Sequence, residues 1–199
     1  TLLMSVLEPP VRQAYDIESR EGLLFVGGFT HSPNTDAMLW FAEEVFPKIL
    51  AQYPDMVLHI VGNKPPREVE DLASENIIVH GFVSEEHLDE LYNECRLAIA
   101  PLRYGAGMKG KVIEAMEKGV PMVTTDIGAE GLSNSSNMLE IANEADEFAA
   151  AVCRLYDNAD RISQMREAGY DYIEEHFSRE SAWEVLKKAI NMSRPSKQT

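Results

Sequence analysis

Short apolar segments that end in glycine or a polar residue recur along the chain, with longer segments between them. The clearest lie at residues 23–26, 56–62, 97–100 and 120–125. A strand that is apolar on both faces must be covered on both faces, which is typical of a parallel sheet between layers of helices. Strands that alternate with helical patterns in this way predict βαβ units and an α/β fold.

The pattern of apolar and polar residues predicts six strands and seven helices along the chain. The strands are expected at 23–26, 56–62, 76–80, 96–101, 120–125 and 137–141, and the helices at 34–52, 66–73, from 84, 111–118, 144–157, 159–175 and 179–191. Asn34 and Ser84 are expected to cap the helices that begin there. We therefore predict a doubly wound, Rossmann-like parallel sheet of about six strands with C-terminal helices. It should form one domain over 23–192, after a linker or lead-in at 1–22 and before a disordered tail at 193–199.

Composition limits the partners of such a domain. A hydrophobic fraction of 45% and a charged fraction of 26% are typical of a soluble globular protein. The net charge of −15 argues against nucleic-acid binding and against docking on an anionic membrane. No transmembrane segment or signal peptide is expected, and two isolated cysteines are expected as buried thiols in a cytoplasmic protein. Because the chain begins with Thr1, we expect a piece of a longer protein.

A glycine-rich loop lies between the fourth strand and its helix. It holds Gly105 and Gly107 together with two cations, Arg103 and Lys109. Glycines let the backbone approach a ligand, and the helix start offers N–H groups and a partial positive charge. The loop therefore predicts a phosphate or diphosphate site; the plain alternative is a flexible surface loop. A P-loop is disfavoured because Val112 stands where a hydroxyl residue would bind Mg²⁺.

Two carboxylates accompany this loop. Glu114 lies one turn into the following helix, where it can accept hydrogen bonds from both ribose hydroxyls. Glu130 follows the fifth strand and is expected to face the same crevice. Either residue would otherwise be an ordinary exposed glutamate.

Glycines end two other strands at the same edge of the sheet. Gly27 and Gly28 follow the first strand and can bring backbone N–H groups to a phosphate. Gly81, Phe82 and Val83 follow the third strand and can border a planar base. Plain packing is an equally good explanation of Phe82. We expect no metal site and no cofactor, since the five histidines are scattered.

Several of these segments, in this order, resemble the C-terminal domain of glycosyltransferase family 4. The motifs are Phe25-Val26-Gly27-Gly28-Phe29, Ile60-Val61-Gly62, Val79-His80-Gly81-Phe82-Val83, Ala100-Pro101-Leu102-Arg103 with the glycine-rich loop, Glu114-Ala115-Met116 and Pro121-Met122-Val123. The resemblance covers about residues 22–190.

The resemblance implies one half of a GT-B fold, in which this domain binds a nucleotide sugar and a missing N-terminal domain supplies most of the acceptor site. It implies sugar transfer with retention and without a metal. Arg103 and Lys109 would hold the diphosphate, Glu114 the ribose, and 81–83 would lie beside the base. Many members carry two glutamates separated by seven residues, and the first of these falls on Ala106 here.

We therefore expect the donor-binding domain of a retaining glycosyltransferase of the hexosyltransferase type, inactive on its own. The alternative is a doubly wound binding or regulatory module without chemistry. A nucleotide triphosphatase is the third hypothesis, and the residue at position 112 disfavours it.

Overall fold

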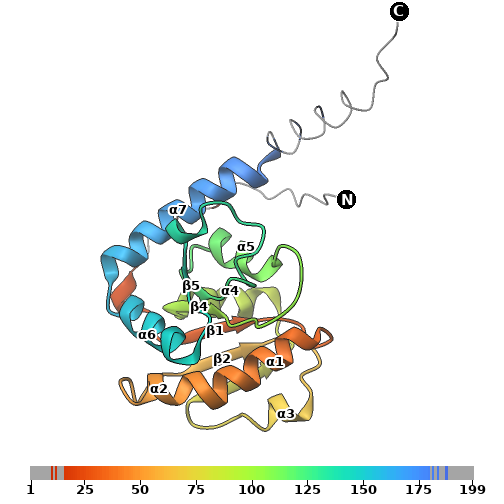
Figure 1. The fold of residues 1–199 in the computed structure, drawn as a ribbon, viewed down its shortest axis with the longest axis vertical. Coiled ribbons are helices and arrows are strands. Elements are labelled where there is room, and N and C mark those ends of the chain that lie inside the picture. The colour runs from red at the N-terminus through yellow and green to blue at the C-terminus, as the bar shows by residue number, and fades with distance from the viewer. Residues whose placement is uncertain are drawn as a thin grey trace, which may run out of the picture.

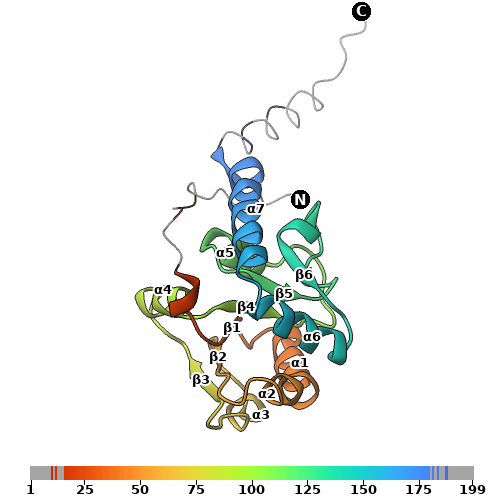
Figure 2. The ribbon, with the colours of Figure 1, turned by 90° about the vertical axis from the view of Figure 1, so that its left-hand side faces the viewer.

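Six parallel strands form one sheet in a computed structural model that describes residues 10, 12, 16–179, 181, 183 and 187. The strands are β1 (Leu23–Val26), β2 (Leu58–Val61), β3 (Ile77–Gly81), β4 (Leu97–Ala100), β5 (Met122–Thr124) and β6 (Leu139–Ile141). Their order across the sheet is β3-β2-β1-β4-β5-β6, the order of doubly wound nucleotide-binding folds (Figure 2). The predicted fold class is confirmed. The order reverses between β1 and β4, which are direct neighbours.

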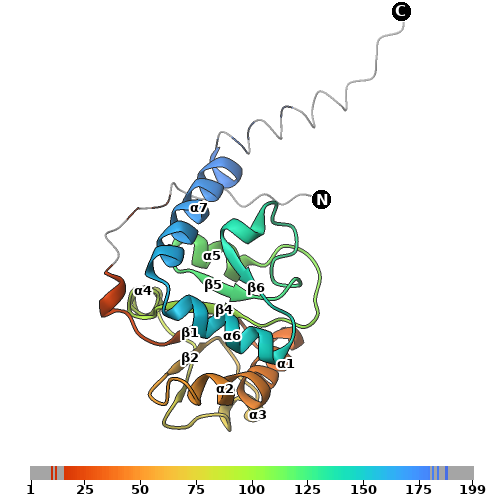
Figure 3. The same cartoon turned by 60° about the vertical axis from the view of Figure 1, so that its left-hand side comes forward.

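Helices cover both faces of this sheet (Figures 1 and 2). They are α1 (Ser32–Trp40), α2 (Phe46–Leu50), α3 (Arg67–Glu70), α4 (Glu85–Glu94), α5 (Gly110–Glu117), α6 (Ala145–Tyr156) and α7 (Ala159–Phe177), with 3-10 turns at Ile17–Ser19 and Ser135–Asn137. Side chains from α1, α2 and α6 form the core on one face, and those from α4 and α5 form the core on the other. The long helix α7 packs along α5 and α6 (Figure 3).

Alternate side chains of the strands enter opposite cores. In β1, Leu23 and Phe25 belong to the core under α1, α2 and α6, whereas Leu24 belongs to the core under α4 and α5. All three are fully buried. This two-sided burial explains why the strands are apolar throughout, since neither face meets water.

The first helical segment differs from its prediction. It begins at Ser32, with His31 rather than Asn34 in the N-cap position, and Asn34 is buried. The single helix expected at 34–52 is interrupted by a π turn at Phe41–Val45, before α2 begins. Pro47 explains the interruption because proline has no N–H and its ring crowds the carbonyl four residues earlier.

The cap of α4 is confirmed in part. The Ser84 hydroxyl accepts a hydrogen bond of 3.2 Å from the backbone N–H of His87. The imidazole of His87 does not complete a capping box, since it lies 3.1 Å from the carboxylate of Glu90.

The two ends of the chain are only partly described. The buried guanidinium of Arg20 donates to the Tyr92 carbonyl at 2.7 Å, which attaches the end of the expected lead-in to α4. Most of the helix expected at 179–191 and all of the tail at 193–199 lie outside the described residues, so the proposed domain boundaries stay predictions. Within the described ranges, no helix combines the length and apolar character needed to span a bilayer.

Candidate functional site

The loops that follow the strands gather at the carboxyl edge of the sheet. Because β1 and β4 are neighbours, the loop after β1 and the glycine-rich loop after β4 meet where the strand order reverses. Helices α1 and α5 both begin there. In doubly wound sheets this switch point is where ligands bind.

Lys111, at the start of α5, occupies the centre of this junction. Its ammonium donates to the Asn34 side-chain oxygen at 2.5 Å and lies 4.1 Å from the centroid of the Phe25 ring. Burial, with a smaller contribution from the nearby Lys109 charge, lowers the pKa of Lys111 to about 7. None of the ion pairs found among the described residues includes Lys111. The site therefore holds a half-buried amine that has no counter-charge among the described residues.

Asn34 connects this amine to the loop after β1. Its amide nitrogen donates to the Gly28 carbonyl at 2.7 Å, while its oxygen accepts from Lys111. A Cβ placed on Gly27 would overlap both the Lys111 ammonium and the Asn34 amide. A larger residue at 27 would therefore have to displace these two side chains from the centre of the site.

Lys109 organises the glycine-rich loop. Its ammonium lies 3.1 Å from a Glu130 carboxylate oxygen and also donates to the Gly107 carbonyl. Only 12% of its side chain is exposed. The loop bends through Gly105 at φ 120° and Gly107 at φ 82°, a region that favours glycine. The two predicted ligand residues at 109 and 130 are thus in contact.

Arg103 lies on the other side of the loop and faces α1. It forms two hydrogen bonds with the Asp36 carboxylate, one of them 2.9 Å long, and its guanidinium lies 5.7 Å from the Trp40 ring. A two-point pair of this kind fixes the geometry of arginine. In this structure the pair ties the loop to α1.

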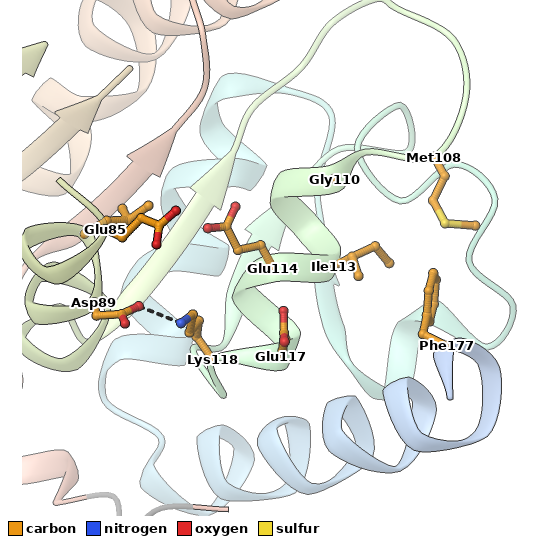
Figure 4. A pocket seen from close by; sticks show the side chains of 10 residues that line it. Glu85, Asp89, Met108, Gly110, Ile113, Glu114, Glu117, Lys118 and Phe177 are labelled. Atoms are coloured by element: carbon orange, nitrogen blue, oxygen red, sulfur yellow. Dashed lines mark hydrogen bonds and ion pairs between the residues drawn. The ribbon is translucent and has the colours of Figure 1, made fainter. Parts of the chain in front are cut away.

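Glu114 opens into a groove between α4 and α5 (Figure 4). The cavity has a volume of about 540 Å³ and is lined by Glu85, Leu88, Asp89, Met108, Gly110, Ile113, Glu114, Glu117, Lys118 and Phe177. Burial raises the pKa of Glu114. Four carboxylates against a single lysine make this groove unfavourable for phosphate groups. It suits a neutral part of a ligand that presents hydroxyl donors.

The third predicted segment ends β3, at the outer edge of the sheet and two strands from β1. Gly81 has φ 69°, Phe82 is 82% exposed, and the half-buried Val83 packs against the core under α4 and α5. The exposure of Phe82 argues against the plain-packing explanation and leaves its ring available at the carboxyl edge.

A second cavity of about 610 Å³ lies at the amino edge of the sheet, with Gly22, His59 and Tyr156 among its lining residues. It is larger than the groove beside α5. The amino ends of parallel strands are not where doubly wound folds bind their ligands, so we assign the candidate site to the carboxyl edge.

Sequence reasoning missed two residues of the site. Asn34 was expected to cap a helix, and Lys111 was not among the predicted site residues. Two lysines separated by one residue in a glycine-rich loop would have been the only signal for Lys111.

The comparisons with known proteins agree with this architecture. Residues 20–158 match the family described as glycosyl transferases group 1. An uncharacterized 44.6 kDa protein in the cps region of Klebsiella pneumoniae is 27% identical over 191 residues, which is 92% of this chain and 49% of that protein. The chain spans about half the length of the curated relatives it matches.

Solved structures show the same fold. TarM superposes with a TM-score of 0.74 at 17% identity, over 94% of this chain and 37% of TarM. HepE of Anabaena, solved in complex with UDP and glucose, superposes with a TM-score of 0.67 at 14% identity, over 88% of this chain and 49% of HepE. Both likenesses cover one Rossmann-like domain of a GT-B enzyme.

Proposed function

The chain belongs to the glycosyl transferases group 1 family, and we propose that its carboxyl-edge site binds the nucleotide part of a nucleotide-sugar donor. The observation that carries the proposal is the half-buried amine of Lys111 at the start of α5, which is hydrogen-bonded to Asn34 but forms none of the ion pairs found among the described residues. We further propose that transfer proceeds with retention and without a metal, as in glycosyltransferase family 4.

The diphosphate is proposed to bind where α5 begins. No side chain caps this helix, so its first N–H groups and its partial positive charge are directed at the glycine-rich loop. Lys109 adds a full charge at that helix start, and Lys111 adds a second one when it is protonated. When the sugar–phosphate bond breaks, negative charge grows on the diphosphate, and cations held in place stabilise that charge. Lys109 and, after release from Asp36, Arg103 are the proposed catalytic groups.

The nucleoside is proposed to extend from that point toward α4. The acidic groove beside α5 rejects phosphate but offers the Glu114 carboxylate to ribose hydroxyls. Gly81, Phe82 and Val83 would then border the base. Because HepE was solved with UDP, UDP is the probe of choice.

The full protein is proposed to pair this domain with an N-terminal domain that binds the acceptor. The support is that the chain spans only about half of its curated relatives. We therefore expect residues 1–199 to bind UDP in the presence of EDTA, measured by calorimetry, but to release no sugar from UDP-sugars in a coupled assay. Sugar transfer to an acceptor by this chain alone would contradict the proposal that the acceptor binds to another domain.

Replacing Glu114 with glutamine tests the ribose contact. We expect about tenfold weaker UDP binding, because a hydrogen bond to a charged acceptor contributes about 1.5–3 kcal/mol and the amide keeps only one acceptor oxygen. Binding of 2′-deoxy-UDP should weaken less, and inorganic pyrophosphate should bind as before. Glu117→Gln, in the same groove, is the matched control and should change none of the three affinities. If the affinity for pyrophosphate fell as much as the affinity for UDP, Glu114 would organise the glycine-rich loop rather than contact the ribose.

A further inference from the structure

We propose that Lys111 takes up a proton when the site binds its anionic ligand, so that ligand binding and protonation are linked. The inference rests on the proposed function, because it concerns the group that would meet the diphosphate. It assigns Lys111 a role different from that of the other two cations of the site.

The contacts of Lys111 leave its charge poorly compensated. An ammonium has three donors, and the hydrogen bond found for this one is to Asn34. The Phe25 ring on another side is apolar, although its face attracts a cation weakly. The position at the start of α5 adds the positive end of the helix dipole, which disfavours a cation.

Among the described residues, the elements around Lys111 bring no anion to it. β1 contributes Phe25, the loop after β1 contributes Gly27, and α1 contributes Asn34, none of which can ionise here. The carboxylates nearest to the loop are already engaged: Glu130 pairs with Lys109, and Asp36 pairs with Arg103.

Among the charged groups of these elements, Lys109 is the one that acts on Lys111, and it disfavours the charged form. Two cations of the site thus have partners before ligand binds, and the third gains its partner only from the ligand. Without ligand, the pKa of Lys111 is lowered to about 7. Above that pH its neutral amine is therefore the favoured form.

The linkage predicts how the affinity for the ligand depends on pH. A diphosphate placed against Lys111 favours the ammonium and raises its pKa. Above neutral pH, binding must therefore include proton uptake, and affinity should fall by up to about tenfold per pH unit until the pKa of the bound state is reached. Below about pH 7 the empty site is already charged, and this dependence should vanish.

Calorimetry of UDP binding at pH 8.0 in HEPES and in Tris measures the proton count, because the two buffers differ in ionisation enthalpy. We expect uptake of about 0.9 proton per UDP bound for the parent chain. Lys111→Arg is the matched control, since arginine stays charged, and it should bind UDP with uptake near zero. Lysine ¹³Cε NMR of the ligand-free chain should show one resonance with a midpoint near pH 7, absent from Lys111→Arg.

The outcomes separate the two proposals. UDP binding with equal proton counts for the parent and Lys111→Arg would overturn the linkage and leave the proposed site intact. A lysine that titrates near pH 7 in a chain that binds neither UDP nor pyrophosphate would overturn the proposed function and, with it, the linkage.

Discussion

Replacing Lys111 with methionine is expected to weaken UDP binding about 100-fold or more at pH 7, a loss of about 3 kcal/mol. The variant removes a charge-assisted contact and leaves a phosphate oxygen facing a buried apolar side chain, which costs more than the contact alone. Calorimetry or equilibrium dialysis measures the loss. Lys48→Met removes an exposed lysine on α2 that pairs with Asp146, and its affinity should equal that of the parent. Equal affinities for parent and Lys111→Met would place the phosphates elsewhere.

The same substitution should make the ligand-free domain more stable. Lys111 has a lowered pKa in the folded chain, so the unfolded chain binds more protons between about pH 7 and the ordinary lysine pKa of about 10.4. The parent's free energy of unfolding should therefore rise with pH across that window. Below the window Lys111 is charged in both the folded and the unfolded chain, so the full cost of placing its charge in the folded site lowers the free energy of unfolding. Urea unfolding at pH 6.0 and 9.5 should show the advantage of Lys111→Met shrinking at the higher pH. An advantage that grows with pH would contradict the assigned state of Lys111.

Replacing Gly62 with alanine is expected to lower the free energy of unfolding by about 3 kcal/mol and to abolish UDP binding. Gly62 directly follows β2, and an added Cβ would overlap the carbonyl group of Gly27, which is backbone and cannot turn aside. Relief requires β1 and β2 to separate, although Gly62 N–H donates to the Gly81 carbonyl at 2.8 Å and Gly27 N–H to the Val61 carbonyl at 2.8 Å. Overpacking of this kind costs about 1–3 kcal/mol, and more where backbone must move.

Gly110→Ala is the control for this result. A Cβ at Gly110 would meet no atom within 4 Å, and the residue starts a helix, where alanine is favoured. Urea unfolding should show this variant as stable as the parent or slightly more stable. A Gly62→Ala variant that unfolds within about 0.5 kcal/mol of the parent, the usual range for neutral surface changes, would refute the close approach of the two loops.

The strands and their common edge could be predicted because their signal is local. A segment such as residues 23–26 is apolar at every position, and only burial on both faces accounts for that pattern. The carboxyl ends of parallel strands then meet at one edge whatever the details of packing. This is why Gly27, Gly81 and Arg103 were all expected at the edge where the structure has them.

The centre of the site could not be predicted because it depends on tertiary contacts. Asparagine near a helix start suggests an N-cap whether its side chain caps the helix or turns inward, and Asn34 turns inward to Gly28 and Lys111. Likewise, nothing in the sequence distinguishes Lys111, whose ammonium lies over the Phe25 ring, from Lys109, which pairs with Glu130. That difference arises only when α5 packs beside β1.

The location of the nucleotide site is tested most directly by a ¹H–¹⁵N NMR titration of the chain with UDP in EDTA. The account predicts saturable shifts of the amide resonances of Gly27 and of residues 107–111, with those around Glu114 also affected. It predicts no change at Gly22 or Tyr156, which line the larger cavity at the amino edge. Shifts confined to that amino-edge cavity, or none at millimolar UDP, would contradict the assignment of a donor site to the carboxyl edge.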